Sequence, residues 1–473
     1  MIINKDEILN LLKEDIFKQI MNTSSKLDIK SFVVGGFVRD YILNRTIVKD
    51  VDILCIGSGI DFAIDIQKSI DPNKKINIYK RFGTAMIKWK DYKIEFVGAR
   101  KESYSKDTRK PKVKPGSFID DMNRRDFTIN TLAISLNKEN YGELIDTFNG
   151  LDDLSKGIIK TPNNPDKTFS DDPLRILRAV RFSSQLKYDI EKNTYESIKR
   201  NLDRIKILSG ERISEEINKI LMQDKPSDGF ILLEKLNILK LILPELESLK
   251  GIEEVEGQTH KDNFYHTLEV VDNICTKTEN LWLRWSALLH DIGKSSTKKF
   301  NKKIGWTFHG HEYVGSKMVK QIFTRLKLPL NDSMKYVQKI VMMSSRPIII
   351  AEEIVTDSAV RRLIYDAGDS IDDLLTLCEA DITTKNKRKF EKYHNNFKIV
   401  REKNKKVEEK DNIRNFQPPV TGEIIMKHFK IGPCKEVGII KDEIKNAILD
   451  GEIENNYKSA FNLMKIKGKS LGL

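Results

Sequence analysis

The segment from Ser31 to Gly57, SFVVGGFVRDYILNRTIVKDVDILCIG, constrains the fold most strongly. It predicts an apolar strand, a Gly-Gly turn, the start of a helix, and a second strand that carries Asp50 and Asp52. Because residues two apart in a strand point to the same face, the two carboxylates project together. Carboxylates hold Mg²⁺ through one or two ligands and leave the other positions to water and substrate phosphate. We therefore expect a magnesium site on this strand.

The Gly-Gly turn indicates what such a metal would act on. Gly35 and Gly36 allow backbone amides to approach a triphosphate closely, and the N-terminus of the following helix favours anions. A Gly-Gly turn alone is common, and an Asp-x-Asp pair is often only a solvated strand end. Together and in this order, they predict a nucleotidyl transferase that uses two metal ions.

Strand signals are confined to the first third of the chain. After Asp146 the apolar residues recur with helical periodicity. We therefore expect an α/β head, with a small mixed sheet plus helices on one side, followed by a largely all-α region. The expected strands are Ser31–Val34, Val51–Ile56, Ile76–Tyr79, Thr84–Trp89 and Lys93–Val97.

The length of 473 residues predicts two to four domains. We divide the chain into a catalytic head (1–147), a helical neck (148–255), a histidine-rich domain (256–385) and a helical tail (386–473). A charged run from Thr384 to Asn415, expected to be a solvated helix or a linker, separates the last two.

The charge of the chain is basic, with a formal net value of +13. This excess suits a polyanionic partner such as RNA, although a lysine-rich composition alone can produce it. The four cysteines lie far apart without a Cys-x-x-Cys pair, which argues against a thiolate zinc site or a disulfide framework and fits a reducing cytoplasm. They are Cys55, Cys275, Cys378 and Cys434.

The N-terminus has the pattern of an amphipathic helix, not of a signal peptide. Ile8, Leu12, Ile16 and Ile20 recur at every fourth position, and acidic residues interrupt the apolar pattern. No apolar run approaches the ~18 residues of a membrane span. We therefore expect no association with a membrane.

The segment RRDFTINTLA is a candidate sugar or phosphate site. Arg124 and Asp126 are expected to start a helix, with Asn130 one turn further on. Adjacent arginines repel one another unless an anion or carboxylate lies nearby, and they pair well with phosphate. An ordinary helix cap with solvated arginines is the alternative.

The segment DDPLRILRAVRF places Asp171 and Arg175 four residues apart on an expected helix, and Arg178 and Arg181 extend nearly the same face. This pattern is typical of a salt-bridged helix surface. A carboxylate and a guanidinium can also present donors and acceptors to a nucleobase edge. Elsewhere, Glu95 shares a strand face with Lys93, and is either a third carboxylate near the metals or a solvated charge.

Five of the seven histidines fall between Gln258 and Val314. His290 and Asp291 are adjacent at the end of an apolar helix, where burial is costly unless something coordinates them. Together with His266 and Asp381 they form a nitrogen and oxygen donor set that suits Mn²⁺, Ni²⁺ or Co²⁺. A second metal centre is therefore expected.

These motifs resemble the bacterial class II tRNA nucleotidyltransferase and poly(A) polymerase family, with a fused HD phosphohydrolase domain. GGxVRD with DxD, RRDFxxNxxA, and DDPLR in place of EDxxR carry the first resemblance, and HDIGK carries the second. The resemblance implies addition of C, C and A to the 3′ end of tRNA from CTP and ATP in the cytoplasm. It also implies that the basic helical second half, including the tail, tracks the tRNA backbone.

The resemblance implies a role for each matching residue. The catalytic Mg²⁺ ligands would be Asp50 and Asp52. The triphosphate would contact Gly35, Gly36 and Arg39, the ribose would contact Arg124, Asp126 and Asn130, and the base would contact Asp172 and Arg175, with Asp171, Arg178 and Arg181 beside them. The HD metal ligands would be His266, His290, Asp291 and Asp381, with His311 favoured over His309 for a second metal or a phosphate.

Three departures from the family's motifs and three alternative functions remain. Asp171 replaces the family's Glu, Lys160 replaces an Arg in the linker motif, and Thr131 replaces an Ala. The basic segment from Lys106 to Asp121 is expected to be a mobile loop. A poly(A) polymerase, an HD-type RNA-end phosphatase or 2′,3′-cyclic phosphodiesterase, and a non-catalytic RNA-binding protein stay open, as does the oligomeric state.

Overall fold

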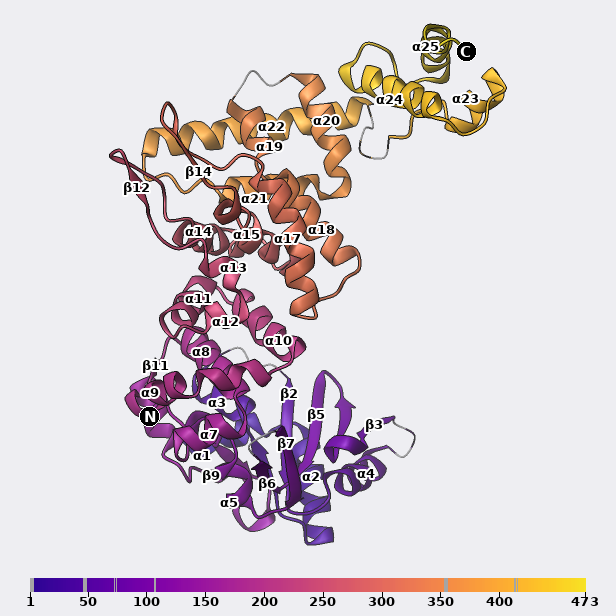
Figure 1. Cartoon of the computed structure of the whole chain (residues 1–473). Helices are drawn as coiled ribbons and strands as arrows, with labels where there is room; N and C mark the ends of the chain where they lie inside the picture. The colour runs from indigo at the N-terminus through magenta and orange to yellow at the C-terminus, as the bar shows by residue number, and fades with distance from the viewer. Residues whose placement is uncertain are drawn as a thin grey trace. The chain divides into compact units, whose positions relative to one another are not determined.

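The computed structural model describes residues 4–45, 49–71, 73, 75–105, 108–352, 356–411, 414 and 416–473. The chain forms two compact units, which Figure 1 shows coloured along the sequence. The first unit comprises Met1–Glu216 and Ile231–Leu241, and the second comprises Ile217–Phe230 and Ile242–Leu473. The α/β head followed by a mostly helical chain is confirmed. The division into four domains stays a prediction.

A seven-stranded mixed sheet organises the first unit, in the order β3-β4-β5-β2-β1-β8-β9. β2 and β5 are parallel, and the other neighbouring strands are antiparallel. The five expected strands are confirmed, and two short strands at one edge were not foreseen. The strands are β1 Ser31–Val34, β2 Asp50–Cys55, β3 Ile76–Tyr79, β4 Thr84–Trp89, β5 Tyr92–Gly98, β8 Ala133–Ser135 and β9 Leu144–Ile145.

The expected N-terminal helix is two helices, α1 (Lys5–Leu11) and α2 (Asp15–Leu27). The spacing correctly identified the inward-facing residues, because all four isoleucine and leucine positions are buried. The single continuous helix was wrong, because the chain leaves helical geometry between Leu12 and Glu14. α2 packs on α4 (Gly59–Ile70), which lies against β4 and β5.

The basic segment after β5 is mostly a hairpin, not a loop. β6 (Arg100–Ser105) pairs antiparallel with β7 (Thr108–Pro115). Lys106 and Asp107 lie outside the described residues, so the prediction of mobility is not addressed there. The hairpin ends at α5 (Phe118–Asn123), which begins with a Ser117–Asp120 capping box.

The rest of the first unit is helical, with one short parallel strand pair, β10 (Ile158–Ile159) and β11 (Asp189–Ile190). Its helices are α6 Gly150–Lys156, α7 Pro165–Asp171, α8 Leu174–Leu186, α9 Lys192–Arg200 and α10 Gly210–Leu221, whose last turn belongs to the second unit.

The second unit is built from helices, with two small hairpins, β12–β13 (Glu254–Val255, Gln258–Thr259) and β14–β15 (Lys299–Asn301, Gly305–Thr307). Within the described residues, no helix is long and apolar enough to cross a membrane. The main helices are α14 Asn263–Cys275, α15 Leu281–Leu289, α17 His311–Arg325, α18 Asp332–Met343, α20 Asp357–Ala367, α21 Ile371–Ala380, α22 Lys387–Asp411, α23 Gly422–Phe429, α24 Lys435–Asp450 and α25 Tyr457–Ser470.

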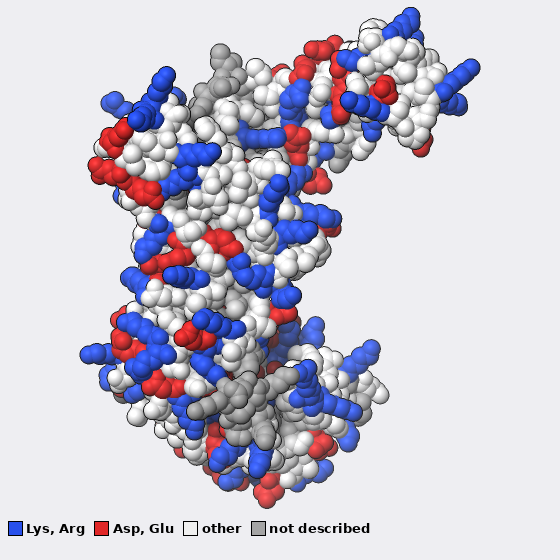
Figure 2. Space-filling view, viewed as in Figure 1, with Lys and Arg blue, Asp and Glu red and all other residues white. Residues whose placement is uncertain are grey.

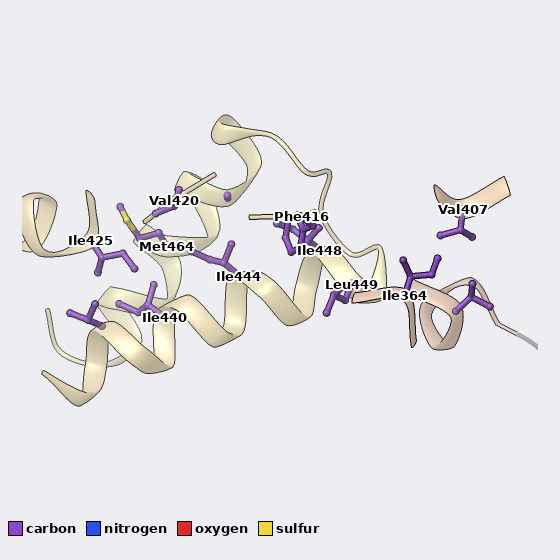
Figure 3. Packing of buried hydrophobic residues seen from close by; sticks show 13 residues of the cluster. Ile364, Val407, Phe416, Val420, Ile425, Ile440, Ile444, Ile448, Leu449 and Met464 are labelled. Carbon is purple, nitrogen blue, oxygen red and sulfur yellow. The ribbon is translucent and has the colours of Figure 1, made fainter. Parts of the chain in front are cut away.

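The C-terminal helices share one core, shown in Figure 3. Ile440, Ile444 and Ile448 recur at every fourth position of α24, so they form one apolar stripe. Ile364 of α20 and Val407 of α22 belong to the same core. The charged run therefore forms a helix, α22, whose inner side is buried.

Candidate functional site

A cavity of about 620 Å³ lies in the first unit where β1 and β2 meet α8. Most of the residues expected at the nucleotide site line it. They are Gly35, Gly36, Arg39, Asp52, Glu95, Arg124, Asp126, Asn130, Asp172, Arg175, Arg178 and Arg181. Two expected residues, Asp50 and Asp171, are not in its lining.

The carboxylates of the cavity come from two parallel strands. Asp52 of β2 lies in register with Glu95 of β5, and Asp50 lies in register with Lys93, whose Nζ is 3.9 Å from Asp50 Oδ1. Val51 between the two aspartates is buried, so both side chains lie on the other face, as expected. Glu95 was expected to be either a third carboxylate near the metals or a solvated charge. Its position beside Asp52 favours the third carboxylate.

The Asp52 side chain is exposed and lines the cavity, where the neighbouring protein atoms remove part of its hydration. This desolvation raises the pKa of Asp52 to about 6, with Arg125 opposing and the charges of Glu95 and Asp50 adding to the rise. The clustered carboxylates repel one another, and a divalent cation would relieve that repulsion. The hard oxygen donors fit Mg²⁺.

Gly35 brings the backbone close to these carboxylates. Its φ of +82° lies in the region that favours glycine. A Cβ added there would lie 3.2 Å from Arg125 Nη1 and 3.5 Å from Asp52 Oδ2. Arg125 therefore belongs to the site. The double arginine in the sequence indicated both residues as partners for phosphate, but we assigned a ribose contact to Arg124 alone.

The expectation that Arg124 begins a helix was wrong. Arg124 stands at the C-terminal end of α5, because the helix starts earlier, at its capping box. Its Nη2 lies 2.5 Å from Oδ1 of Asp121, which is fully buried. Arg125 Nη2 lies 3.4 Å from the other oxygen of Asp121. The shared carboxylate holds the two guanidinium groups side by side.

Asp126 is the centre of a buried polar chain. Its Oδ2 accepts from Arg178 Nε at 2.6 Å, and its Oδ1 accepts from Asn130 Nδ2 at 2.9 Å. Asn130 Oδ1 in turn accepts from Arg39 Nη1 at 2.7 Å. Burial opposes ionisation of Asp126, but Arg178 and Asn130 outweigh it and lower its pKa to about 2. Arg39 also binds Asp40, so neighbours hold its guanidinium in place.

The helix expected to join Asp171 to Arg175 is interrupted. α7 ends at Asp171, Pro173 stands between the helices, and α8 begins at Leu174, so the expected four-residue spacing on one helix was wrong. Asp171 lines a separate cavity of about 450 Å³. Asp172 lines the main cavity, and Arg175 lines both. Arg175 donates to the carbonyls of Arg124 at 2.5 Å and Thr168 at 3.3 Å.

Two residues that support the arginines were not anticipated. Glu216 Oε2 accepts from Arg181 Nε at 2.6 Å. The Phe182 ring carries three guanidinium groups, those of Arg39, Arg178 and Arg181, at 4.8, 5.2 and 4.0 Å. The contacts of Glu216 with Arg181 and of Arg39 with Phe182 join segments at least 35 residues apart, so no local pattern could reveal them.

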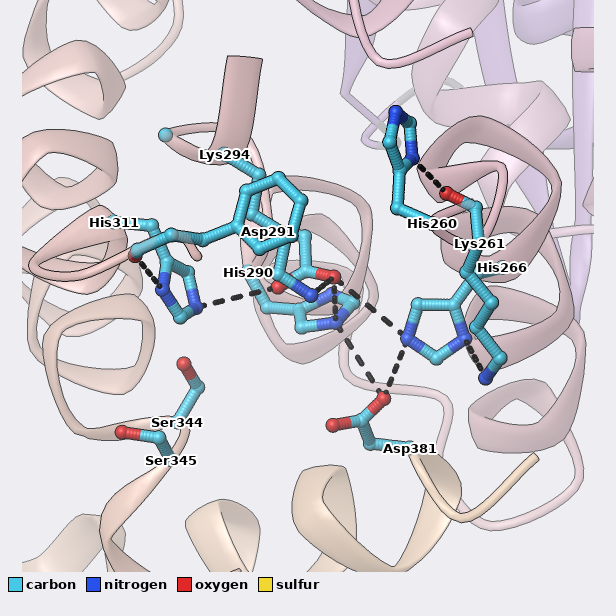
Figure 4. Close-up of polar contacts among 12 residues, drawn as sticks. His260, Lys261, His266, His290, Asp291, Lys294, His311, Ser344, Ser345 and Asp381 are labelled. Carbon is cyan, nitrogen blue, oxygen red and sulfur yellow. Dashed lines mark hydrogen bonds and ion pairs between the residues drawn. The ribbon is translucent and has the colours of Figure 1, made fainter. Parts of the chain in front are cut away.

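A second cluster lies in the other unit and is shown in Figure 4. His266 comes from α14, His290 and Asp291 follow α15, and Asp381 follows α21. His266 Nε2 is 2.8 Å from Asp381 Oδ1 and 3.7 Å from Asp291 Oδ2. The ligand atoms of His266, His290 and Asp381 all lie within 4.8 Å of one another. The structure thus brings together the four residues expected to bind metal.

The His290 ring is oriented for coordination. Its Nδ1 lies 2.8 Å from the carbonyl oxygen of Ala287. Its buried Nε2 makes no hydrogen bond within the described residues, but lies 3.4 Å from Asp291 Oδ2 and 3.7 Å from Asp381 Oδ1. Burial opposes a positive charge on this ring, yet Asp291 and Asp381 outweigh it and raise the pKa of His290 to about 10. The cluster therefore stabilises positive charge where the ring nitrogens and carboxylates meet, and it fits a divalent cation.

The two remaining candidates of this region differ in position. His311 Nε2 lies 3.5 Å from Asp291 Oδ1, whereas His309 is exposed. The preference for His311 agrees with this geometry. Lys294 was not anticipated; its Nζ donates to Asp291 Oδ2 at 2.6 Å.

Three family models match successive parts of the chain. They are the poly A polymerase head domain at residues 31–160, the probable RNA and SrmB-binding site of polymerase A at 187–250, and the HD domain at 263–383.

The curated relatives are named as A-adding or CCA-adding enzymes, or as multifunctional CCA proteins. An A-adding tRNA nucleotidyltransferase of Aquifex aeolicus is 31% identical over 61% of this chain and 35% of its own length. A CCA-adding enzyme of Lactobacillus helveticus is 37% identical over 42% of this chain and 48% of its own. A multifunctional CCA protein of Neisseria meningitidis serogroup B is 30% identical over 64% of this chain and 69% of its own. The chain thus covers about a third of the first relative and about half of the second.

Solved structures match over nearly the whole length. The Thermotoga maritima CCA-adding enzyme complexed with tRNA has a TM-score of 0.59 at 20% identity, covering 98% of each chain. A CCA-adding enzyme in apo form has a TM-score of 0.63 at 22% identity, covering 96% of this chain and 97% of its own. At these identities the likeness shows a common fold.

Proposed function

The chain belongs to the class II tRNA nucleotidyltransferase and poly(A) polymerase family with an HD domain, and we propose that it adds C, C and A to the 3′ end of tRNA. The observation that carries this proposal is the cavity that joins the Asp52–Glu95 carboxylates to a wall of arginines. CTP and ATP are the proposed substrates, and the cytoplasm is the proposed location. Lys and Arg side chains spread over the visible face in Figure 2 suit a tRNA partner.

Different residues of the cavity would bind the metal, the triphosphate, the sugar and the base. Asp50 and Asp52 would hold Mg²⁺, which when bound makes the acceptor 3′-hydroxyl more acidic and offsets charge at the α-phosphate. Gly35 leaves room for the triphosphate beside Asp52, and Arg125 faces the same space. Arg124 and Asn130 are placed to orient the sugar. Asp172 and Arg175 would read the base, with Arg175 fixed by two backbone carbonyls.

A second candidate function is addition of the terminal A alone. The name of the Aquifex relative favours it. The cavity serves either reaction, because both join a nucleotide to a 3′-hydroxyl. The two differ only in the acceptor ends and nucleotides they accept.

Three tRNA acceptors separate these functions. The purified protein receives Mg²⁺, CTP and ATP with tRNA that ends at the nucleotide before CCA, after the first C, or after the second C. We expect extension by three, two and one nucleotides. Extension only of the last acceptor, and only with ATP, would indicate an A-adding enzyme. Long tails from ATP alone would indicate a poly(A) polymerase.

For the second cluster we propose a phosphohydrolase that acts on phosphorylated RNA ends. His266, His290, Asp291 and Asp381 would hold a transition metal such as Ni²⁺, Mn²⁺ or Co²⁺, which when bound supplies an activated water. Hydrolysis of 2′,3′-cyclic AMP with each metal tests this, with Asp291→Asn as the inactive variant. Absence of hydrolysis with every metal would leave the cluster a binding site only.

A further inference from the structure

Phe82 is an apolar aromatic residue whose side chain is exposed to water. It belongs to the 3₁₀ turn η1 (Lys80–Phe82), and its side chain is 63% exposed. Leaving such a ring in water forgoes the favourable free energy of burying its apolar surface. Scattered exposed apolar residues are ordinary. Phe82 differs because it lines the cavity that also contains Asp52 and Glu95.

The sheet places Phe82 away from the arginine wall. β2 carries the aspartates; β1, with Gly35 after it, lies on one side, and β5, β4 and β3 lie on the other. Thr84 of β4 is in register with Val97 of β5, two residues beyond Glu95. Leu54, Val97 and Thr84 line the cavity between the carboxylates and Phe82. The cavity therefore continues past the carboxylates over these three uncharged side chains, and Arg100 of β6 also lines it.

We propose that Phe82 stacks on the 3′-terminal base of the RNA that accepts the nucleotide. This inference rests on the proposed function. The reaction joins the α-phosphate to the 3′-hydroxyl at the carboxylates, so the acceptor must approach from the side that the nucleotide does not occupy. Gly35 and the arginines mark the nucleotide side, which leaves the Phe82 side for the acceptor.

Stacking on an aromatic ring suits this acceptor, because its last base changes with every addition. A phenyl ring accepts any base, whereas hydrogen-bond readout would select one. Lys80 and Arg81 are exposed beside Phe82, and the Arg81 guanidinium lies 5.9 Å from the ring centre. These cations are placed to pair with backbone phosphate. Tyr79, 44% exposed, lies opposite Thr84 and extends the aromatic surface on the same face.

Steady-state kinetics with separate titration of RNA and nucleotide tests the proposal. Phe82→Ala is expected to raise KM for tRNA about tenfold, which is within the range for loss of one stacked base, and to leave KM for CTP within twofold. Phe82→Trp should keep the wild-type KM, and Phe82→Leu, which is apolar without a ring, should behave like Phe82→Ala. Ile78→Ala is the matched control, because Ile78 is exposed on the same hairpin but does not line the cavity.

A tRNA with 2-aminopurine at its 3′ end gives a readout that needs no catalysis. Its fluorescence should fall on binding to wild type and Phe82→Trp and stay high with Phe82→Ala. An unchanged KM for tRNA in Phe82→Ala, or a raised KM for CTP instead, would overturn the stacking while wild-type extension upholds the proposed function. A wild type that extends no tRNA would overturn both.

Discussion

At the scale of the residue, the cavity depends on arginines that are paired with almost fully buried carboxylates. Asp126 binds Arg178 and Asn130, and Asn130 binds Arg39. Asp121 holds Arg124 and Arg125 together. A carboxylate or an amide therefore fixes the position of each of these four arginines. This arrangement limits the entropy that the arginines would lose on binding a triphosphate.

Asp126→Asn is expected to lower the free energy of unfolding by about 3 kcal/mol at pH 7, because it leaves the Arg178 guanidinium without its partner charge. The pKa of Asp126 is lowered to about 2, so its contribution is present above the unfolded pKa near 4 and is lost as pH falls from there towards 2. Urea unfolding at pH 7 and at about pH 3 measures the difference, because the contribution of Asp126 is lost below pH 4. Asp203→Asn removes one partner of a solvent-exposed ion pair and should cost much less stability than Asp126→Asn. Equal losses in both variants would contradict the account.

Gly35→Ala is expected to lower kcat at least tenfold, since its Cβ would enter the space between Arg125 and Asp52. The matched control is Gly57→Ala, which has a positive φ but no atom within 4 Å of the added Cβ. Both variants should lose about 1 kcal/mol of stability through backbone strain. Single-turnover extension of tRNA separates them, and a similar loss of rate in both would assign the effect to strain alone.

At the scale of the element, the local sequence pattern predicted the strands and the faces on which their side chains lie. The five strands follow runs of apolar and β-branched residues, and their alternation correctly placed Asp50 and Asp52 on one face. Two helix boundaries were predicted wrongly, although the sequence contains a local signal for each. Pro173 separates α7 from α8, and the capping box of Ser117 and Asp120 starts α5 before the arginines. The contacts of Glu216 with Arg181 and of Asp126 with Arg178 had no such signal, because tertiary packing creates them.

The junction of α7 and α8 predicts separable roles for Asp172. Its Oδ1 accepts from the backbone N–H of Leu174, the first residue of α8, at 3.2 Å. Asp172→Ala should cost about 1 kcal/mol through loss of this hydrogen bond, whereas Asp172→Asn keeps an oxygen to accept it and should cost less than half of that. Both should change the ratio of kcat/KM for CTP and ATP at least fivefold. An unchanged ratio in Asp172→Asn would limit the residue to a structural role.

At the scale of the whole molecule, the two clusters belong to different compact units and share no residues. His290→Ala should abolish high-affinity Mn²⁺ or Ni²⁺ binding in calorimetry and leave tRNA extension within about twofold. Asp52→Asn should abolish tRNA extension and leave Mn²⁺ or Ni²⁺ binding to the second cluster unchanged. Loss of both functions from either substitution would contradict the independence of the two sites.

The basic charge of the chain predicts how salt affects its substrates. Raising salt from 50 to 200 mM should weaken binding of tRNA on the order of tenfold or more, because phosphate contacts release counterions. Binding of CTP involves fewer phosphates and should weaken much less. Filter binding and nucleotide titration measure the two dependences, and equal slopes would argue against an extended RNA-binding surface.

The most direct test of the central claim is the product formed on a tRNA that lacks its last three nucleotides. With Mg²⁺, CTP and ATP, wild type should add C, C and A and then stop, while Asp52→Asn should add nothing although it still binds tRNA. The same three-nucleotide product from Asp52→Asn, or no product from wild type, would contradict the assignment of the cavity as the site of nucleotide addition.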